Sequence, residues 1–274
     1  MKTLLWTLLI ALQSPLIQAF TLNNNVSAHF AQDEVTVNVS AAANACSNIG
    51  LTKDDLLSLI SEAVDRFWND VPTSRLRLKA GGEVEVSANF ETGKLCEQVI
   101  FGDVCDGPAS DIPKVSDNIV VACNSNSEYA GILGIALPNN IDGEIIKGSA
   151  VLIYSGTNSG FGSKSRDEQI SIIAHELGHA IGLGHSPADA ALMYYQSMAN
   201  RMYLSRDDIK GVTYLYPKEE KLGGVVGCGS LALLDKIDPP SGPWTGGVVS
   251  IFFWMVIGLS MGKLLKMRPK ARQS

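Results

Sequence analysis

The chain has 274 residues, and its 22 basic and 28 acidic side chains give a formal net charge of −6 at pH 7. This acidic balance argues against nucleic acid as a partner. The length suffices for one domain of about two hundred residues with a packed core, together with terminal segments.

The amino terminus has the pattern of a secretory signal peptide. A basic start at Lys2 precedes an apolar run over residues 4–12, and a small residue, Ala19, closes the segment. The run is too short for a membrane anchor, so we predict a signal peptide over residues 1–19 with cleavage after Ala19. The rest of the chain would then follow the secretory pathway.

The expected domain covers residues 20–218 and begins with a strand and a helix. Valines at alternating positions predict the strand over residues 34–39. Thr52 is a suitable N-cap for an amphipathic helix that would end near Pro72.

Strands follow this helix and lead to a second helical region. Five stretches have strand character: residues 75–79, 83–86, 118–123, 131–137 and 149–154. The last two would be joined through turns at residues 138–140 and 142–143. This order favours an α+β fold with a mixed, mostly parallel twisted sheet covered by helices.

Five cysteines in an exported chain predict disulfide bonds. Cys46, Cys96, Cys105 and Cys123 lie in the domain and can pair in three ways. The short spacing favours Cys96 with Cys105, which leaves Cys46 with Cys123. Cys228 lies beyond the domain, and its role stays open.

Three of the four histidines fall within residues 175–185. His175 and His179 are four positions apart, so on a helix both imidazoles would lie on one face and reach one metal ion. Gly182 would let the backbone turn and bring in His185 as a third ligand. Three neutral histidines and one open position are typical of a catalytic zinc site. Glu176 would act as the general base on water activated by the zinc.

The helix that carries this motif has a clear start and a core-facing side. Ser165 and Glu168 have the spacing of a capping box. Ile173, Leu177 and Ile181 recur opposite the histidines. One face of the helix should therefore enter the core, and the other should face a cleft.

The spacing H-E-x-x-H-x-x-G-x-x-H of residues 175–185 is the signature of metzincin metallopeptidases. With Ser186 after the third histidine and the segment Ala191-Leu192-Met193-Tyr194, the chain resembles the matrixins, the matrix-metalloproteinase branch. The resemblance implies a metzincin-type catalytic domain with one catalytic Zn²⁺ ion and a C-terminal helix. Met193 would form an apolar floor beneath the zinc histidines.

Residues 204–211 are similar to the matrixin C-terminal helix. By this resemblance, Asp208 would bind the backbone around Met193, and Asp207 would receive the mature N-terminal amine. The alternative is that both acids serve only to stabilise the first turn of the helix, where negative charge interacts favourably with the helix dipole.

Residues 131–136 are similar to the matrixin edge strand over the cleft. There the backbone of Leu133 and Gly134 would bind an extended peptide as an added strand. A simple core strand is the alternative. Tyr195 stands where matrixins usually have proline. It would form a wall of the pocket, with an additional zinc ligand or an oxyanion stabiliser as alternatives.

The chain also departs from the family in its second metal site and its propeptide. No histidine lies between His29 and His175, so the family's structural zinc should be absent. Calcium held by Asp103 and Asp106 stays an open alternative. Because few residues lie between Ala19 and Val35, we expect the family's zinc-blocking propeptide to be absent as well.

Residues 20–34 are the only candidate for an inhibitory segment. His29, Asp33 and Glu34 are its only plausible metal ligands, and so short a segment offers little buried area to hold it in a cleft. We therefore predict activity once the signal peptide is removed and zinc is bound, without a further cut.

Beyond the domain, residues 219–243 have the composition of a linker. Residues 244–262 form an uncharged apolar stretch long enough for a single transmembrane helix. Residues 263–274 carry several basic side chains and no acidic one, which predicts a cytoplasmic tail and a domain on the outer face of the cell membrane. A buried C-terminal helix is the alternative.

Together these features predict a membrane-anchored zinc endopeptidase that hydrolyses extracytoplasmic proteins or peptides, in the periplasm or outside the cell. An exopeptidase is a lesser variant. The alternative is a non-catalytic surface module that contains zinc for folding and binds partners in its cleft, although such a module has no need of Glu176. The oligomeric state stays open.

Overall fold

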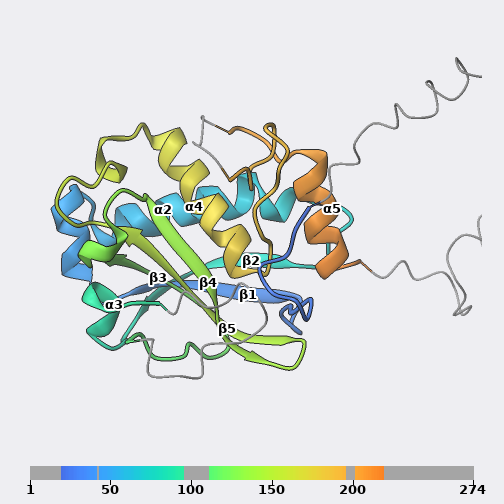
Figure 1. The fold of residues 1–274 in the computed structure, drawn as a ribbon, viewed down its shortest axis with the longest axis horizontal. Helices are drawn as coiled ribbons and strands as arrows, with labels where there is room; N and C mark the ends of the chain where they lie inside the picture. Colours follow the sequence, from blue (N-terminus) through green and yellow to red (C-terminus); the bar gives the residue numbers. More distant parts are fainter. Residues whose placement is uncertain (1–19, 42, 96–110, 196–200, 219–274) are drawn as a thin grey trace, which may run out of the picture. The chain divides into compact units, whose positions relative to one another are not determined.

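The computed structural model of the chain describes residues 20–41, 43–95, 111–195 and 201–218. Five strands form one sheet in the order β2-β1-β3-β5-β4 (Figure 1). They are β1 (Glu34–Ser40), β2 (Arg77–Val84), β3 (Ile119–Asn124), β4 (Gly134–Asp142) and β5 (Ile145–Tyr154). All neighbours are parallel except β4 and β5. The predicted mixed, mostly parallel sheet is confirmed, and β4 lies at its edge.

Helices precede and follow the strands as the sequence predicts. The α-helices are α2 (Lys53–Arg66), α3 (Asn89–Thr92), α4 (Arg166–Ala180) and α5 (Arg206–Leu215). The 3₁₀ segments are η1 (Ala43–Ile49), η2 (Trp68–Asp70), η4 (Ser127–Tyr129) and η5 (Phe161–Ser163). Each long helix begins with a capping box, formed by Thr52, Ser165 and Ser205 with the acid three residues later. The predicted starts at Thr52 and Ser165 are therefore confirmed.

The two faces of the sheet enter different cores. Val37, Val121 and Val151 belong to the larger core, which they share with α2 and α4. Their neighbours Val120 and Ala150 belong to a smaller core on the other face. This alternation follows from the two-residue period of a strand. Since α4 packs against β4 and β5, the histidine motif lies over the edge of the sheet.

Two predicted strands prove to be one. The prediction separated residues 75–79 from residues 83–86, but β2 runs through Gly81 and Gly82. The register shifts here, because Asn38 of β1 stands opposite two glycines. A Cβ on Gly81 would lie 2.1 Å from Asn38 Oδ1, and that oxygen accepts a hydrogen bond from Gly82 N at 3.2 Å. The glycines thus form a bulge within the strand.

The hairpin between β4 and β5 also differs from the prediction. Residues 138–140 do not form a turn: β4 continues through Pro138 to Asp142, with register shifts after Pro138 and after Asn140. The chain reverses at Gly143, whose φ of +60° suits glycine. The helix expected to reach Pro72 ends at Arg66 and continues as η2.

A disulfide joins Cys46 of η1 to Cys123 of β3, with a Cα–Cα distance of 5.1 Å. This is the pair that remained after the short spacing assigned Cys96 to Cys105, and it is confirmed. Cys96, Cys105 and Cys228 lie outside the described residues.

Both predicted terminal segments lie outside the part of the chain that the structure describes. They are the signal peptide at residues 1–19 and the linker, membrane span and tail at residues 219–274. Among the described residues, no helix is both long enough and apolar enough to cross a bilayer.

Candidate active site

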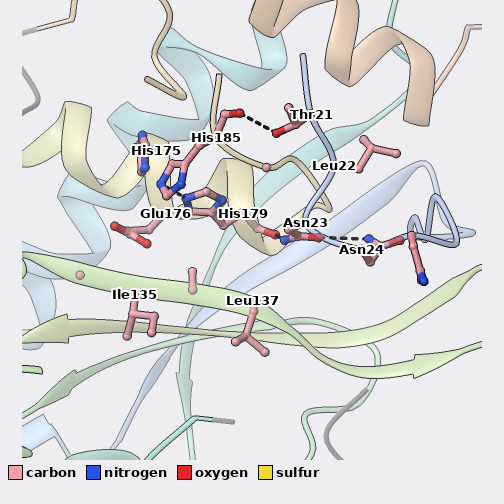
Figure 2. A pocket seen from close by; sticks show the side chains of 14 residues that line it. Thr21, Leu22, Asn23, Asn24, Ile135, Leu137, His175, Glu176, His179 and His185 are labelled. Carbon is pink, nitrogen blue, oxygen red and sulfur yellow. Dashed lines mark hydrogen bonds between the residues drawn. The ribbon is translucent and has the colours of Figure 1, made fainter. Parts of the chain in front are cut away.

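Helix α4 and the turn after it bring the three predicted ligands together. The ligand nitrogens of His175, His179 and His185 all lie within 4.8 Å of one another (Figure 2). Nε2 of His179 lies 3.2 Å from Nε2 of His185. Gly182 makes this possible, because its φ of +106° turns the backbone out of the helix.

Backbone carbonyls fix the orientation of two of the rings. Nδ1 of His175 lies 2.7 Å from the carbonyl oxygen of Leu192, and Nδ1 of His179 lies 2.9 Å from that of Leu183. A carbonyl can only accept, so each Nδ1 carries the proton and each Nε2 presents a lone pair. These lone pairs are available to a metal ion that binds between the rings.

A zinc ion fits this geometry. Two ligand nitrogens about 2.0–2.1 Å from a tetrahedral zinc ion lie about 3.3 Å apart, close to the observed spacing of His179 and His185. Burial lowers the pKa of His175 to about 4 and holds the pKa of His179 well below its ordinary value. Both rings are therefore neutral near pH 7, as metal ligands must be. No other group of three or more potential metal ligands occurs among the described residues.

Glu176 lies between the histidines and the edge strand. It is 7% exposed, and a Cβ on Gly134 of β4 would come within 2.9 Å of its Cγ. Burial raises the pKa of its carboxyl to about 8. A bound cation acts in the opposite direction, because a positive neighbour favours the carboxylate.

A chain of contacts leads from α5 to the first histidine. Asp208 accepts hydrogen bonds from the backbone N–H groups of Leu192, at 2.8 Å, and Met193, at 3.1 Å. The carbonyl of Leu192 then accepts from His175. Met193 is buried against α4, since a Cβ on Gly178 would lie 2.3 Å from its sulfur. These contacts connect Asp208 and Met193 to the zinc motif.

Matches to known proteins agree with this site. A family model described as Matrixin matches residues 14–217. The chain belongs to the matrixin family. Human matrix metalloproteinase-20 is 26% identical over 196 residues, which cover 70% of this chain and 33% of that protein. Rat matrilysin is 44% identical over 54 residues, which cover 19% of this chain and 20% of that protein. The chain thus matches a third or less of the length of each of these relatives.

Matrixins are zinc metalloendopeptidases, and the three histidines of this matrixin supply the ligands that such an enzyme needs. The resemblance drawn from the zinc motif and the Ala-Leu-Met-Tyr segment is therefore confirmed. Asp103 and Asp106, the candidate calcium ligands, lie outside the described residues.

The remaining carboxylate of α5 is only partly paired. Oδ2 of Asp207 accepts a hydrogen bond from the Ser186 hydroxyl at 2.5 Å. Its buried Oδ1 has no hydrogen-bond partner among the described residues. Phe20 packs against the outside of α5, and its ring centroid lies 5.4 Å from that of Tyr214. That the mature N-terminal amine pairs with Asp207 stays a prediction.

The three predicted substrate-binding residues differ in whether they line the cleft. Gly134 lines a cleft of about 700 Å³ together with the three histidines and Glu176. The carbonyl of Leu133 already accepts a hydrogen bond from Tyr154 N of β5, at 3.1 Å. Tyr195 is 57% exposed, packs against Tyr194, and is not among the described residues that line the cleft.

The sequence prediction missed one wall of the cleft. Residues 21–25 line it opposite β4 (Figure 2). The candidate blocking ligands further along lie elsewhere: the backbone of His29 pairs with Glu144 and Ile146, and Asp33 pairs with Arg75 at 2.7 Å. No periodicity or motif in residues 20–34 signals this arrangement, which depends on contacts with the distant motif turn.

The last carbonyls of α4 accept hydrogen bonds from three remote side chains. Asn23 Nδ2 donates to His179 O at 2.6 Å, and the Ser149 hydroxyl donates to Ala180 O at 2.6 Å. The Tyr216 hydroxyl donates to Ile181 O at 2.8 Å. Carbonyls at a helix end lack partners within the helix, so these contacts stabilise the turn that leads to His185.

Proposed function

We propose that this matrixin is a zinc-dependent endopeptidase that hydrolyses extracytoplasmic proteins or peptides with Glu176 as its general base. The observation that supports this most is the position of Glu176. Its buried carboxyl lies between the three-histidine cluster and Gly134 on the edge strand. A peptide aligned on that strand would have its backbone beside both groups.

His175, His179 and His185 would hold the metal, and the carbonyls of Leu192 and Leu183 keep two of the rings oriented for it. When bound, zinc lowers the pKa of a water molecule and polarises the scissile carbonyl. The carboxylate of Glu176 would accept a proton from that water and then donate it to the leaving amine. Its burial keeps the proton from exchanging freely with solvent between the two steps.

The substrate would bind as an added strand on β4. Among the described residues, no strand pairs with the outer edge of β4, so its backbone groups can pair with an extended peptide. Leu133 and Gly134 would flank the scissile bond, because Gly134 contacts Glu176. In this proposal Tyr195 has no part in the chemistry.

We also propose that residues 244–262 anchor the enzyme in the cell membrane, with the catalytic domain outside. The support is the uncharged stretch and the basic tail that follows it. The full chain should stay with membranes after alkaline carbonate extraction, and its domain should be digested by protease added to intact cells or spheroplasts. Recovery of the mature chain in the soluble fraction would contradict the anchor.

The decisive test of the activity is Glu176→Gln in the full chain, purified in detergent, with zinc content and N-terminal sequence measured. The wild type should cut a mixed peptide library internally, and a chelator should stop it. Glu176→Gln should retain zinc and lose about 10²–10⁴-fold in kcat/KM.

The matched control is Glu144→Gln, an exposed glutamate on the β4–β5 turn, which should keep full activity. Full activity of Glu176→Gln would overturn the general-base assignment. Trimming from peptide ends alone would indicate an exopeptidase. A zinc-loaded wild type that cuts nothing would favour the binding module.

A further inference from the structure

Residues 20–25, here called the strap, run alongside the turn that carries the zinc ligands. Leu22 forms an antiparallel bridge with Leu183. Asn23 N donates to Gly182 O at 3.1 Å, and Gly184 N donates to Thr21 O at 2.8 Å. The strap is therefore joined to the turn between His179 and His185 by backbone hydrogen bonds on both sides.

Side chains of the strap add further bonds to the same turn. The Thr21 hydroxyl donates to His185 O at 2.5 Å, and Asn23 Nδ2 donates to His179 O at 2.6 Å. Asn24 Nδ2 donates to Asn23 Oδ1 at 3.0 Å, while Asn24 Oδ1 accepts from Ala28 N at 2.8 Å. These bonds fix the strap in one position beside the ligands (Figure 2).

Glycines on the domain make room for the strap and the residues after it. A Cβ on Gly184 would lie 2.5 Å from Thr21 Oγ1, and one on Gly182 would lie 2.7 Å from Ala28 O. A Cβ on Gly211 of α5 would lie 3.2 Å from the Cβ of Phe20. The surface is thus shaped to receive this segment closely, which distinguishes the strap from a loosely attached tail.

The strap faces β4 across the cleft. Residues 21–25 line one side, and residues 134–137 line the other. The side chains of Ile135 and Leu137 point away from the histidines, into the smaller core, so β4 presents mainly backbone to the cleft (Figure 2). Among the described residues, the strap is therefore the part of this end of the cleft whose side chains are placed to select those of a substrate.

The length of β4 sets how far from the scissile bond the strap acts. Gly134 contacts Glu176, and Leu137 lies three residues further, roughly 10 Å along the strand. A peptide paired with β4 would meet the strap two to four residues from the scissile bond. It would do so on one side of that bond only.

We propose that the strap is a specificity wall that selects substrate side chains with a carbonyl group, namely Asp, Glu, Asn and Gln, at this distance from the scissile bond. Three consecutive asparagines, residues 23–25, supply the recognition. A carboxamide nitrogen has two N–H donors, and Asn23 uses one of them for His179 O. The inference rests on the proposed peptidase function, because it concerns the same cleft.

The test compares cleavage-site profiles of the zinc-loaded full chain and three variants. Asn25→Leu removes the carboxamide of an exposed residue that lines the cleft. It should reduce the preference for carbonyl side chains about three- to tenfold, at one position and on one side of the scissile bond. Asn25→Gln, which keeps the carboxamide, should restore it.

The control is Val26→Leu, an exposed residue next to the strap that is not among the described residues lining the cleft. Its profile should match that of the wild type. The proposal is overturned if Asn25→Leu leaves the profile unchanged, or changes it on both sides of the bond.

A binding experiment separates this proposal from the peptidase function. Zinc-loaded Glu176→Gln is titrated with two peptides that differ only by Gln or Leu at the position that reaches the strap. The Gln peptide should bind about three- to tenfold more tightly, and Asn25→Leu in the same background should abolish the difference. Equal binding of the two peptides overturns the strap proposal even if the wild type is a peptidase. A wild type that cuts nothing but shows the Gln preference overturns only the peptidase function.

Discussion

Helix α4 is fixed at its amino-terminal end by its own capping box, by an ion pair with α2 and, indirectly, by a disulfide, and at its carboxyl-terminal end by uncharged hydrogen bonds from distant segments. At the first end, Ser165 and Glu168 form the capping box, and Asp167 pairs with Arg66 at 2.8 Å. The preceding η5 packs on η1, which the disulfide joins to β3.

The other end carries the chemistry and has no such link. Its carbonyls accept from Asn23, Ser149 and Tyr216, which lie in the strap, in β5 and just after α5. Asp208 acts in the same region through Leu192. The difference suggests a division of roles, in which the first end contributes mainly stability and the second end sets zinc geometry. The following variants test that division.

The largest effect should come from the disulfide. In Cys46→Ala/Cys123→Ala the lost link spans 77 residues, so the free energy of unfolding should fall by about 4 kcal/mol. The zinc affinity of the folded protein should stay within about twofold, because η1 packs on η5, which precedes the amino-terminal end of α4. Urea unfolding and chelator competition measure the two quantities. A tenfold loss of zinc affinity would contradict the division of roles.

Asp208→Ala should cost about 3 kcal/mol, because it leaves the buried N–H groups of Leu192 and Met193 without an acceptor. Unlike the disulfide variant, it should also weaken zinc binding, since Leu192 orients His175. Thermal unfolding and zinc titration check both effects. Asp54→Ala, at an exposed position of α2, serves as the control and should change neither by much. Unchanged zinc affinity in Asp208→Ala would show that Asp208 of α5 does not influence the zinc site.

Gly184→Ala should destabilise the domain by about 2 kcal/mol, because the new Cβ would overlap Thr21 and Leu22. The strap should loosen, and amide hydrogens of residues 21–28 should exchange faster. Gly82→Ala is the matched control, since a Cβ there meets nothing within 4 Å. Unchanged exchange in Gly184→Ala would show that the strap does not depend on this close approach.

The smallest effect is expected for Thr21→Val, which removes the hydrogen bond to His185 O. Stability should fall by about 1 kcal/mol, as for one hydrogen bond. Zinc should dissociate somewhat faster, because His185 is the most exposed of the three ligands. The exposed Thr157→Val provides the comparison in stopped-flow chelation. Equal rates of zinc dissociation in the two variants would show that Thr21 does not help to hold His185 in place.

The features that sequence predicted correctly are encoded within a few residues. The N-cap at Thr52, the capping box at Ser165, the zinc motif and the alternation in β1 each depend on one local period or pair. The role of Met193 beneath the zinc histidines was inferred from the family pattern instead.

What the sequence prediction missed depends on contacts between distant segments. Gly81 and Gly82 have the composition of a turn, and only the register with Asn38 makes them a bulge. Residues 138–140 also have turn composition, but pairing with β5 keeps them in a strand. The strap has no local signature at all, because its position is set by glycines some 160 residues away.

The register shift in β4 after Pro138 limits which conformations of a substrate can bind. Proline has no N–H to donate, and the register shifts after it, so an added strand can pair regularly only with residues 134–137, roughly 13 Å of chain. A segment must be extended and freed from its own secondary structure to fit there. For a folded protein, the rate of cleavage would then follow the population of locally unfolded conformers. We expect the enzyme to respond to the local stability of its target as well as to its sequence, so that a stabilising ligand protects a site whose residues it never touches.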